Sequence, residues 1–243
     1  FVEGGATLIV DWLGEALRTH GHEVEIFRIP FSGHLPEMIE QMLALRLMDF
    51  NGHAARLIAV RTPSYLLRHS NKICWFIHHH RAAYDLWNTV YRNIPMTPEG
   101  LRYRDAIRSA DNVALREARR VFCNSRVVGE RLKKYNGIDA GVLYPPLNHP
   151  ERYRTGDYGG YLFYVSRLTH HKRQWLAVEA LRHVTTPVRL VIAGSPDPGA
   201  ESYAEELQAL VRKYQLGDRV LLVPRWISED EKIDLWADCL AGV

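Results

Sequence analysis

Residues 161–181, YLFYVSRLTHHKRQWLAVEAL, decide the fold of this chain. The first five residues are apolar or aromatic and predict a buried strand. A polar loop carrying Arg167 and Lys172 follows, and the next apolar segment predicts a helix over 172–184. Doubly wound sheets bind ligands at the carboxyl ends of their strands, and a helix N-terminus adds positive potential and N–H donors. The two cations therefore predict a diphosphate site.

Strands and helices alternate on both sides of this stretch, which predicts α/β layers with mostly parallel sheets. Further strands are expected at 24–27, 57–60, 73–77, 121–123, 142–144, 188–192, 220–223 and from 241 onward. Helices are expected around 8–17 and over 36–49, 99–118, 126–135, 201–214 and 229–238. Ser125 and Ser228 are placed to cap the helices that follow them.

The rhythm is interrupted once, at 147–160, which is rich in Pro, Gly, Arg and Tyr and has no clear period. We interpret this stretch as a linker. It divides the 243 residues into an N-terminal domain over 1–150 and a C-terminal domain over 151–243.

The bulk composition limits the class of protein. With 47% hydrophobic and 24% charged residues, the chain is an ordinary globular one, and no apolar run approaches the roughly 18 residues that span a membrane. A formal net charge of +3 suits an anionic substrate or a membrane surface and gives no ground to expect nucleic-acid binding. The well-separated Cys74, Cys123 and Cys239 are expected to be free thiols in a reducing cytoplasm.

Several segments together resemble one family, the GT-B retaining glycosyltransferases of the glycosyl transferases group 1 type (family 4-like). They are the strand–S-R-x-x-x-x-K–helix segment at 161–181, KICWFIHHHRAAYDLW at 72–87, NS at 124–125, VLYPPL at 142–147 and VLLVPRWISEDEKIDLW at 220–236. The resemblance covers essentially the whole chain. It implies two Rossmann-like domains facing a cleft, both incomplete. In the family, a pair of glutamates eight residues apart follows the strand that would begin here at Ala241. The given sequence ends at Val243, before that position, so we expect a fragment that is truncated at both ends and inactive as it stands.

The resemblance also implies roles for particular residues. Arg167 and Lys172 would hold the diphosphate of a nucleotide-sugar donor, and His78 would contact the sugar as the catalytic residue. The residues expected to line the donor site and cleft are Gly4, Gly5, Gly194, Ser195, Trp226 and Ile227. The frequent glycine of the family is replaced near Arg225 and Trp226, which leaves the identity of the base open.

Some of these residues also have plain structural interpretations. Arg167 and Lys172 also fit a pair of surface cations, and Glu3-Gly4-Gly5 also fits a flexible start of a helix. Residues 78–80 also fit a solvated loop, and a metal site is not expected because adjacent side chains of an extended chain point to opposite faces. Trp87 is expected to pack in the core, and Tyr84 is left open between packing and sugar contact.

The function implied is transfer of a hexose from a nucleotide diphosphate sugar to a hydroxyl acceptor with retention, for example in polysaccharide biosynthesis. Neither a metal ion nor another cofactor is expected. The partners would be the nucleotide-sugar donor and a sugar or lipid-linked acceptor. The protein would be cytoplasmic, with peripheral contact at the inner face of the membrane. The alternatives are a non-catalytic GT-B-like nucleotide-binding module, a nucleotide-sugar epimerase or a phosphorylase.

Overall fold

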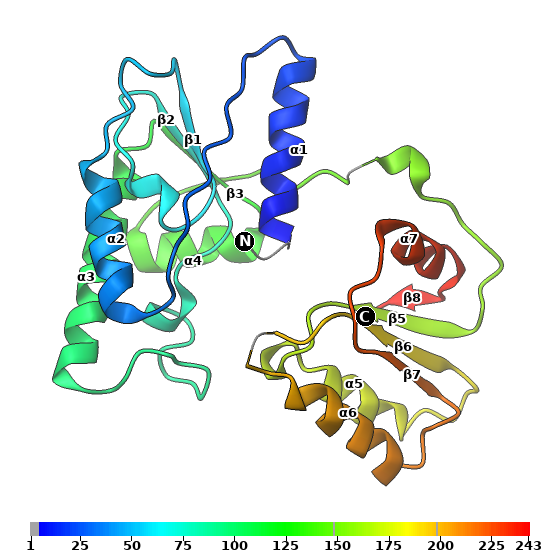
Figure 1. The fold of residues 1–243 in the computed structure, drawn as a ribbon. Helices are drawn as coiled ribbons and strands as arrows, with labels where there is room; N and C mark the ends of the chain where they lie inside the picture. Colours follow the sequence, from blue (N-terminus) through cyan, green and yellow to red (C-terminus); the bar gives the residue numbers. More distant parts are fainter. Residues whose placement is uncertain (1–4, 148, 198) are drawn as a thin grey trace. The chain divides into compact units, whose positions relative to one another are not determined.

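The computed structural model describes residues 5–147, 149–197 and 199–243, and it divides into two compact units, Phe1–Asn148 and His149–Val243. Each unit has its own four-stranded sheet, in which every strand pair is parallel (Figure 1). The α/β class with parallel sheets is thus confirmed.

The first unit is built on the sheet β1-β2-β3-β4. Its strands are β1 (Leu57–Ala59), β2 (Lys72–Phe76), β3 (Arg120–Cys123) and β4 (Gly141–Val142). Its helices are α1 (Gly5–Thr19), α2 (Leu35–Leu47), α3 (Pro98–Arg116) and α4 (Arg126–Asn136), with 3₁₀ turns η1 (Ser64–Leu66) and η2 (Arg81–Ala83). These elements agree with the predicted ones to within a few residues, and Ser125 caps α4 by accepting a hydrogen bond from the Val128 N–H.

Apolar side chains cover both faces of the first sheet. α1 packs Ile9 against Val60, Trp75 and Ile77, while a larger core on the other face includes Phe76. Strands buried on both faces explain why the sequence at 73–77 is a continuous apolar run rather than an alternating one.

The strand predicted at 24–27 is wrong. These residues carry no strand assignment, and they alternate between partly buried and exposed positions. Their alternating polar and apolar side chains resemble a strand, but no neighbouring strand within the described residues offers the backbone partners that a ladder needs.

The second unit has the sheet β7-β6-β5-β8, made of β7 (Val220–Val223), β6 (Arg189–Ala193), β5 (Tyr161–Val165) and β8 (Ala241–Gly242). α5 (Gln174–Leu181) and α6 (Ser202–Lys213) cover one face, and α7 (Glu229–Asp238) lies on the other (Figure 1). Phe163 and Ile192, both fully buried, point into the two opposite cores. The Ser228 hydroxyl caps α7 by accepting from the Glu231 N–H, as predicted.

The helix expected over 172–184 is shorter than predicted and begins later. A 3₁₀ turn η4 (His170–Lys172) comes first, and Arg173 then adopts a left-handed conformation with φ of 63°. Because that conformation cannot continue a right-handed helix, α5 starts at Gln174 and not at Lys172.

Most of the predicted linker is attached to the second unit. The 3₁₀ turn η3 (Pro150–Arg152) opens it, and Arg152 and Arg154 pair with Asp230 and Asp234 of α7. The Gly156 and Gly159 N–H groups then bond to carbonyls at the end of α7, Gly156 at 2.8 Å and Gly159 at 2.6 Å. The stretch 152–160 is therefore a strap along α7.

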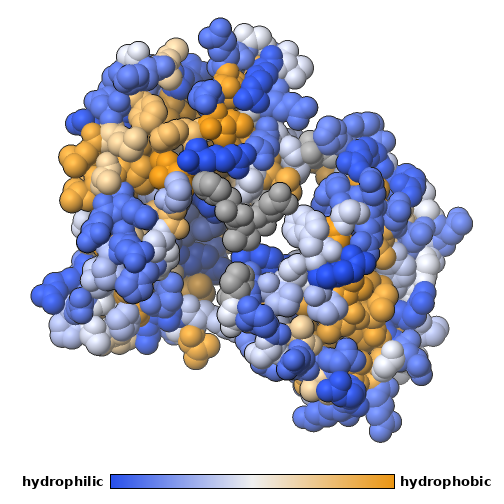
Figure 2. Space-filling model, in the orientation of Figure 1, coloured by the Kyte–Doolittle hydropathy of each residue, from blue (hydrophilic) through white to orange (hydrophobic). Residues whose placement is uncertain are grey.

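Hydrophilic side chains cover most of the face shown in Figure 2, with hydrophobic patches on each unit. All three cysteines are free, as predicted, and the structure shows that they are also buried. Within the described ranges, no helix is both long and apolar enough to cross a bilayer.

Candidate functional site

The connections that leave β5, β6 and β7 are joined side by side at the carboxyl edge of the second sheet. The Gly194 N–H donates to the Val223 carbonyl at 3.1 Å, and the Ser166 N–H donates to the Ala193 carbonyl at 3.1 Å. The Leu168 N–H then reaches the Ser195 carbonyl at 2.9 Å. The edge therefore brings together the predicted residues from three segments of the sequence.

Gly194 is required by the close approach of two of these connections. Its φ is +150°, and a Cβ at this position would lie 1.9 Å from the Ser166 carbonyl oxygen. The resemblance implied that Gly194 lines the donor site, whereas the neighbour that excludes a side chain here is the chain itself.

Arg167 lies on this edge and forms an ion pair. Its Nη1 donates to the Oδ1 of Asp197 at 2.7 Å, with 51% of the Arg167 side chain exposed and 18% of the Asp197 side chain. The Asp197 N–H bonds to the Leu168 carbonyl, so the carboxylate sits on backbone that is fixed to the Arg167 loop. One ordered bond aims the guanidinium and leaves its other N–H groups available to an anion.

Gln174 hydrogen-bonds to the loop that carries Arg167, and it was not among the residues singled out in the sequence. Its buried side-chain N–H₂ donates to the Ser166 hydroxyl and to the Arg167 carbonyl, each at 2.8 Å. Its Oε1 is buried with no hydrogen-bond partner within the part of the chain that the structure describes. A glutamine at the start of a helix gives no sequence signal of such a contact.

Lys172 ends η4 and is exposed at the same connection, and among the described residues no ion pair holds it. Its carbonyl accepts the Tyr164 hydroxyl, which fixes the backbone of the turn while leaving the side chain free to move. The start of α5 offers fewer free donors than predicted, because the Trp175 N–H already bonds to the Tyr203 hydroxyl at 3.2 Å.

Trp226 and Ile227 follow β7 on the same edge and differ in burial. Trp226 is 60% exposed, so its ring is open to stack on a ligand. Ile227 is buried in the core formed with Phe163, which leaves only its backbone for a contact. Arg225, which stands near the position of the missing family glycine, forms a two-pronged pair with Glu231 at 2.7 and 3.0 Å.

The other predicted site residues belong to the first unit. His78 follows β2, and its Nδ1 lies 2.6 Å from the His79 carbonyl, so Nδ1 carries the proton and donates. Burial, together with the charges of Arg61 and Arg81, lowers the pKa of His78, whereas the bond to the His79 carbonyl opposes this. The neutral ring therefore keeps an unprotonated Nε2, which accepts from a hydroxyl group.

His79 has a structural role. It is buried, its Nε2 lies 2.7 Å from the Asn136 Oδ1, and burial lowers its pKa to about 4. The two neighbouring imidazoles, His78 and His79, thus have separate partners. Over the described ranges, no three His, Cys, Asp or Glu side chains are grouped to hold a metal ion.

The question left open for Tyr84 is answered by packing. Tyr84 and Trp87 are both buried, and the Tyr84 hydroxyl donates to Asp111 at 2.7 Å. Tyr65 donates to the other oxygen of Asp111 at 2.7 Å, and burial raises the pKa of this carboxyl to about 6. This core carboxylate on α3 was not singled out in the sequence.

The glycines expected at the N-terminal side are only partly described. Gly4 lies outside the described residues. Gly5 is the exposed first residue of α1, with open space where a Cβ would lie.

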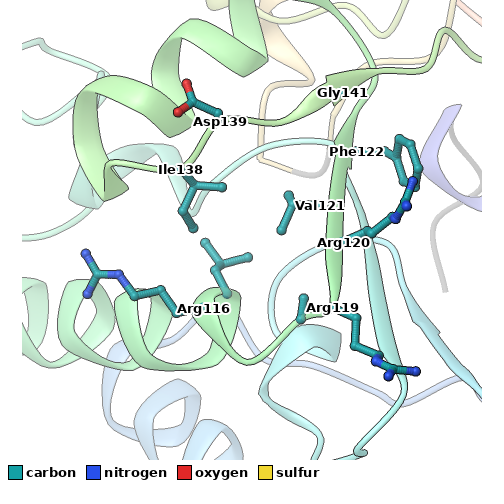
Figure 3. Close-up of a pocket in the computed structure, with 10 residues that line it drawn as sticks. Arg116, Arg119, Arg120, Val121, Phe122, Ile138, Asp139 and Gly141 are labelled. Carbon is teal, nitrogen blue, oxygen red and sulfur yellow. The ribbon is translucent and has the colours of Figure 1, made fainter.

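A cavity of about 450 Å³ lies at the amino ends of β3 and β4, away from the carboxyl edge that carries His78. It is lined by Arg116, Arg119, Arg120, Phe122 and Asp139, among others. Figure 3 shows the three arginine side chains pointing in different directions, so they do not converge on one ligand.

Residues 149–241 match the model of the family described as "Glycosyl transferases group 1". A search of curated protein sequences found no match.

Solved structures resemble the whole chain. HepE from Anabaena, solved with UDP and glucose, is 17% identical with a TM-score of 0.58, and the match covers 98% of this chain and 70% of that one. Sucrose-phosphate synthase from Thermosynechococcus elongatus is 14% identical with a TM-score of 0.65, covering 98% and 69%. A glycosyltransferase from Rickettsia africae is 14% identical with a TM-score of 0.63, covering 98% and 69%. The GT-B fold and the resemblance to glycosyltransferases are therefore confirmed.

Proposed function

On the premise of this family match and fold, we propose that the chain belongs to a glycosyltransferase that moves a hexose from a nucleotide diphosphate sugar to a hydroxyl acceptor. Retention of the anomeric configuration and independence of a metal ion are part of the proposal. The observation that carries it is the presence, in one connection at the carboxyl edge of the second sheet, of an aimed guanidinium, Arg167, and an ammonium, Lys172, that has no ion pair among the described residues.

The chemistry of sugar transfer explains the need for these two cations. When the bond between the sugar and the diphosphate breaks, negative charge develops on the departing oxygen, and fixed cations beside it stabilise the transition state. A guanidinium matches two phosphate oxygens at once, whereas an ammonium supplies a compact point charge. Gln174 and Asp197 hold Arg167 in place before the donor arrives, which reduces the entropy lost on binding.

The remaining predicted residues take supporting roles in the proposal. Trp226 is exposed and is proposed to stack on the base, and the backbone of Ile227 and the Ser195 side chain are proposed to face the nucleotide. In the first unit, His78 accepts a sugar hydroxyl at Nε2. Gly4 and Gly5 are proposed to lie beside the sugar. The acceptor is proposed to be a sugar or a lipid-linked sugar, with the protein working in the cytoplasm at the inner face of the membrane.

Calorimetric titration of the chain with UDP tests the site, since UDP and UDP-glucose occupy the HepE structures. Each charge-assisted hydrogen bond is worth about 1.5–3 kcal/mol. Arg167→Ala combined with Lys172→Ala is therefore expected to weaken UDP binding at least about 100-fold. Arg212→Ala with Lys213→Ala removes the same two charges from the last turn of α6 and is expected to leave affinity within about twofold. Equal affinity of the site variant and the parent chain contradicts the assignment.

Transfer itself is tested by mass spectrometry of reactions with UDP-, GDP- and ADP-sugars and a panel of hydroxyl acceptors. The expected product carries one added hexose, and the coupling constant of its anomeric proton reports retention. Tight nucleotide binding without any product from the panel favours the non-catalytic nucleotide-binding module, and a changed sugar without transfer favours the epimerase.

A further inference from the structure

The carboxyl edge of the first sheet carries a cluster of charged groups that the donor site does not use. The Ile77 N–H donates to the Val60 carbonyl at 3.2 Å, which sets the end of β2 beside the end of β1. Arg61 follows Val60 and His78 follows Ile77, so these two residues leave the carboxyl edge of the sheet side by side. The charge of Arg61 lowers the pKa of His78, although less than burial does, which is consistent with this neighbourhood.

Two further arginines share one carboxylate in the segment that follows His78, and the charges of Arg81 and Asp85 both act on His78. Arg81 holds Asp85 with Nε at 3.0 Å and Nη2 at 2.7 Å, and Arg131 of α4 reaches the same Asp85 oxygen at 3.2 Å. The Asp85 side chain is 16% exposed, whereas those of Arg81 and Arg131 are 38% and 32% exposed. The carboxylate is thus covered while its two cations remain accessible.

The charges do not balance. Arg61, Arg81 and Arg131 bring three positive charges and Asp85 brings one negative charge, so the cluster has an excess of two. Asp85 needs only one arginine to be satisfied, and Arg61 is exposed with no ion pair among the described residues. Two half-buried guanidinium groups and one exposed one, with a surplus of two charges, are suited to a dianion that accepts several N–H bonds at once.

We propose that the first unit binds an acceptor bearing a phosphate monoester, which Arg61, Arg81 and Arg131 hold beside His78. This inference rests on the proposed function, because it names the acceptor class of the same enzyme. The phosphate takes the free N–H groups of the arginines, and the neighbouring hydroxyl donates to the Nε2 of His78. Asp85 keeps Arg81 and Arg131 aimed, so it is a positioning residue.

NMR of the complete chain with labelled histidine tests the proposal by following the His78 ring during titration with glucose 6-phosphate. Saturable shifts are expected, with inorganic phosphate weaker and glucose at least tenfold weaker than the ester. Vesicles containing phosphatidate form a second arm, and shifts from the vesicles but not from glucose 6-phosphate assign the phosphate to a lipid headgroup.

Charge-removing variants make the test specific. Arg61→Gln with Arg131→Gln is expected to weaken glucose 6-phosphate at least tenfold. Arg119→Gln with Arg120→Gln, at the amino end of β3, removes the same charge and is expected to change affinity less than twofold (Figure 3). Arg61→Gln alone guards against misfolding of the double variant, because this exposed side chain is outside every ion pair of the described residues, and a loss of at least threefold is expected.

The absence of saturable His78 shifts from both ligands, or an equal loss in the two double variants, overturns the inference. UDP titration of the same sample separates this result from a failure of the proposed function. A chain that binds UDP through Arg167 and Lys172 but leaves His78 unmoved by either phosphate ligand keeps the donor site and loses the acceptor proposal. A chain that does the reverse keeps only the phosphate site.

Discussion

The Arg167–Asp197 pair sets how strongly the donor site attracts an anion. Asp197→Asn keeps an oxygen that accepts from the guanidinium and removes a negative charge a few ångströms from the proposed diphosphate. Because a charge at that distance repels a diphosphate by about 1 kcal/mol, UDP is expected to bind about 3–10 times more tightly.

Calorimetry at low and high NaCl checks this prediction, since the gain is expected to shrink as salt screens the repulsion. In an Arg167→Ala background no guanidinium offsets the carboxylate, so the same substitution is expected to give at least as large a gain. Weaker UDP binding by Asp197→Asn would show that the charge of Asp197 serves mainly to position Arg167.

Asp111 predicts a pH dependence of stability. Its pKa is about 6 in the fold, above the ordinary value of 3.8, because it is buried. A raised pKa means that the folded state binds the proton more tightly than the unfolded state. This contribution to the free energy of unfolding is therefore fully present below about pH 3.8 and is lost as pH rises through about 6.

Asp111→Asn removes that proton linkage. Urea unfolding at pH 4.5 and pH 7.5 is expected to show a difference between parent and variant that changes by about 2 kcal/mol, with the variant gaining relative to the parent at the higher pH. Asp105→Asn on the exposed side of α3 is the control. An identical pH dependence in parent and Asp111→Asn would contradict the assignment.

The sequence identified residues whose type alone determines their role, and it missed those whose role depends on distant partners. Ser125 and Ser228 were predictable because a hydroxyl before a helix caps the N–H three residues later. Asp197, Gln174 and Asp111 were not, because their partners lie on other elements and nothing in the local sequence marks them.

Among the elements, the connection between β6 and α6 is tightly constrained by its neighbour. Gly194→Ala places a Cβ against the Ser166 carbonyl, and the backbone must move to relieve the contact. We expect a loss of about 2–4 kcal/mol in the free energy of unfolding and weaker UDP binding, because the displaced loop carries Arg167.

Chemical denaturation and calorimetry check the effect of Gly194→Ala. Gly217→Ala is the matched control, because its Cβ meets open space and its φ is not positive. It is expected to change stability by less than about 1 kcal/mol. Similar stability for the two alanine variants would disprove the close contact.

Most elements were predictable because their apolar runs are buried on both faces of a sheet. The 161–165 and 220–223 strands match the predicted limits. The failures are cases where tertiary context overrides the pattern. The alternating 24–27 segment has no neighbouring strand within the described residues, and the left-handed Arg173 delays α5.

For the whole molecule, the strap along α7 changes where the connection between the two units begins. The Gly156 and Gly159 amides are bonded to the end of α7, whereas residues 144–147 make no backbone hydrogen bond among those described. Hydrogen-exchange mass spectrometry is expected to find peptides of 152–160 protected together with α7, while the amides of Tyr144 and Leu147 exchange quickly, since Pro145 and Pro146 carry none.

Arg152→Gln with Arg154→Gln removes both ion pairs to α7 and is expected to speed exchange in 152–160 without affecting β6. Glu151→Gln is the control, since its partner His149 lies within the same short turn. Equally fast exchange in 144–147 and 152–160 of the parent chain would mean that the strap does not persist in solution.

Because the strap belongs to the second unit, the true tether is the handful of residues from Tyr144 to His149. Fully stretched, a peptide of this length reaches about 20 Å, at roughly 3.5 Å for each residue. Each inserted residue would lengthen the maximum reach of this tether by about 3.5 Å. Insertions or deletions in 144–147 therefore change the length of this tether without changing any residue proposed to bind a ligand.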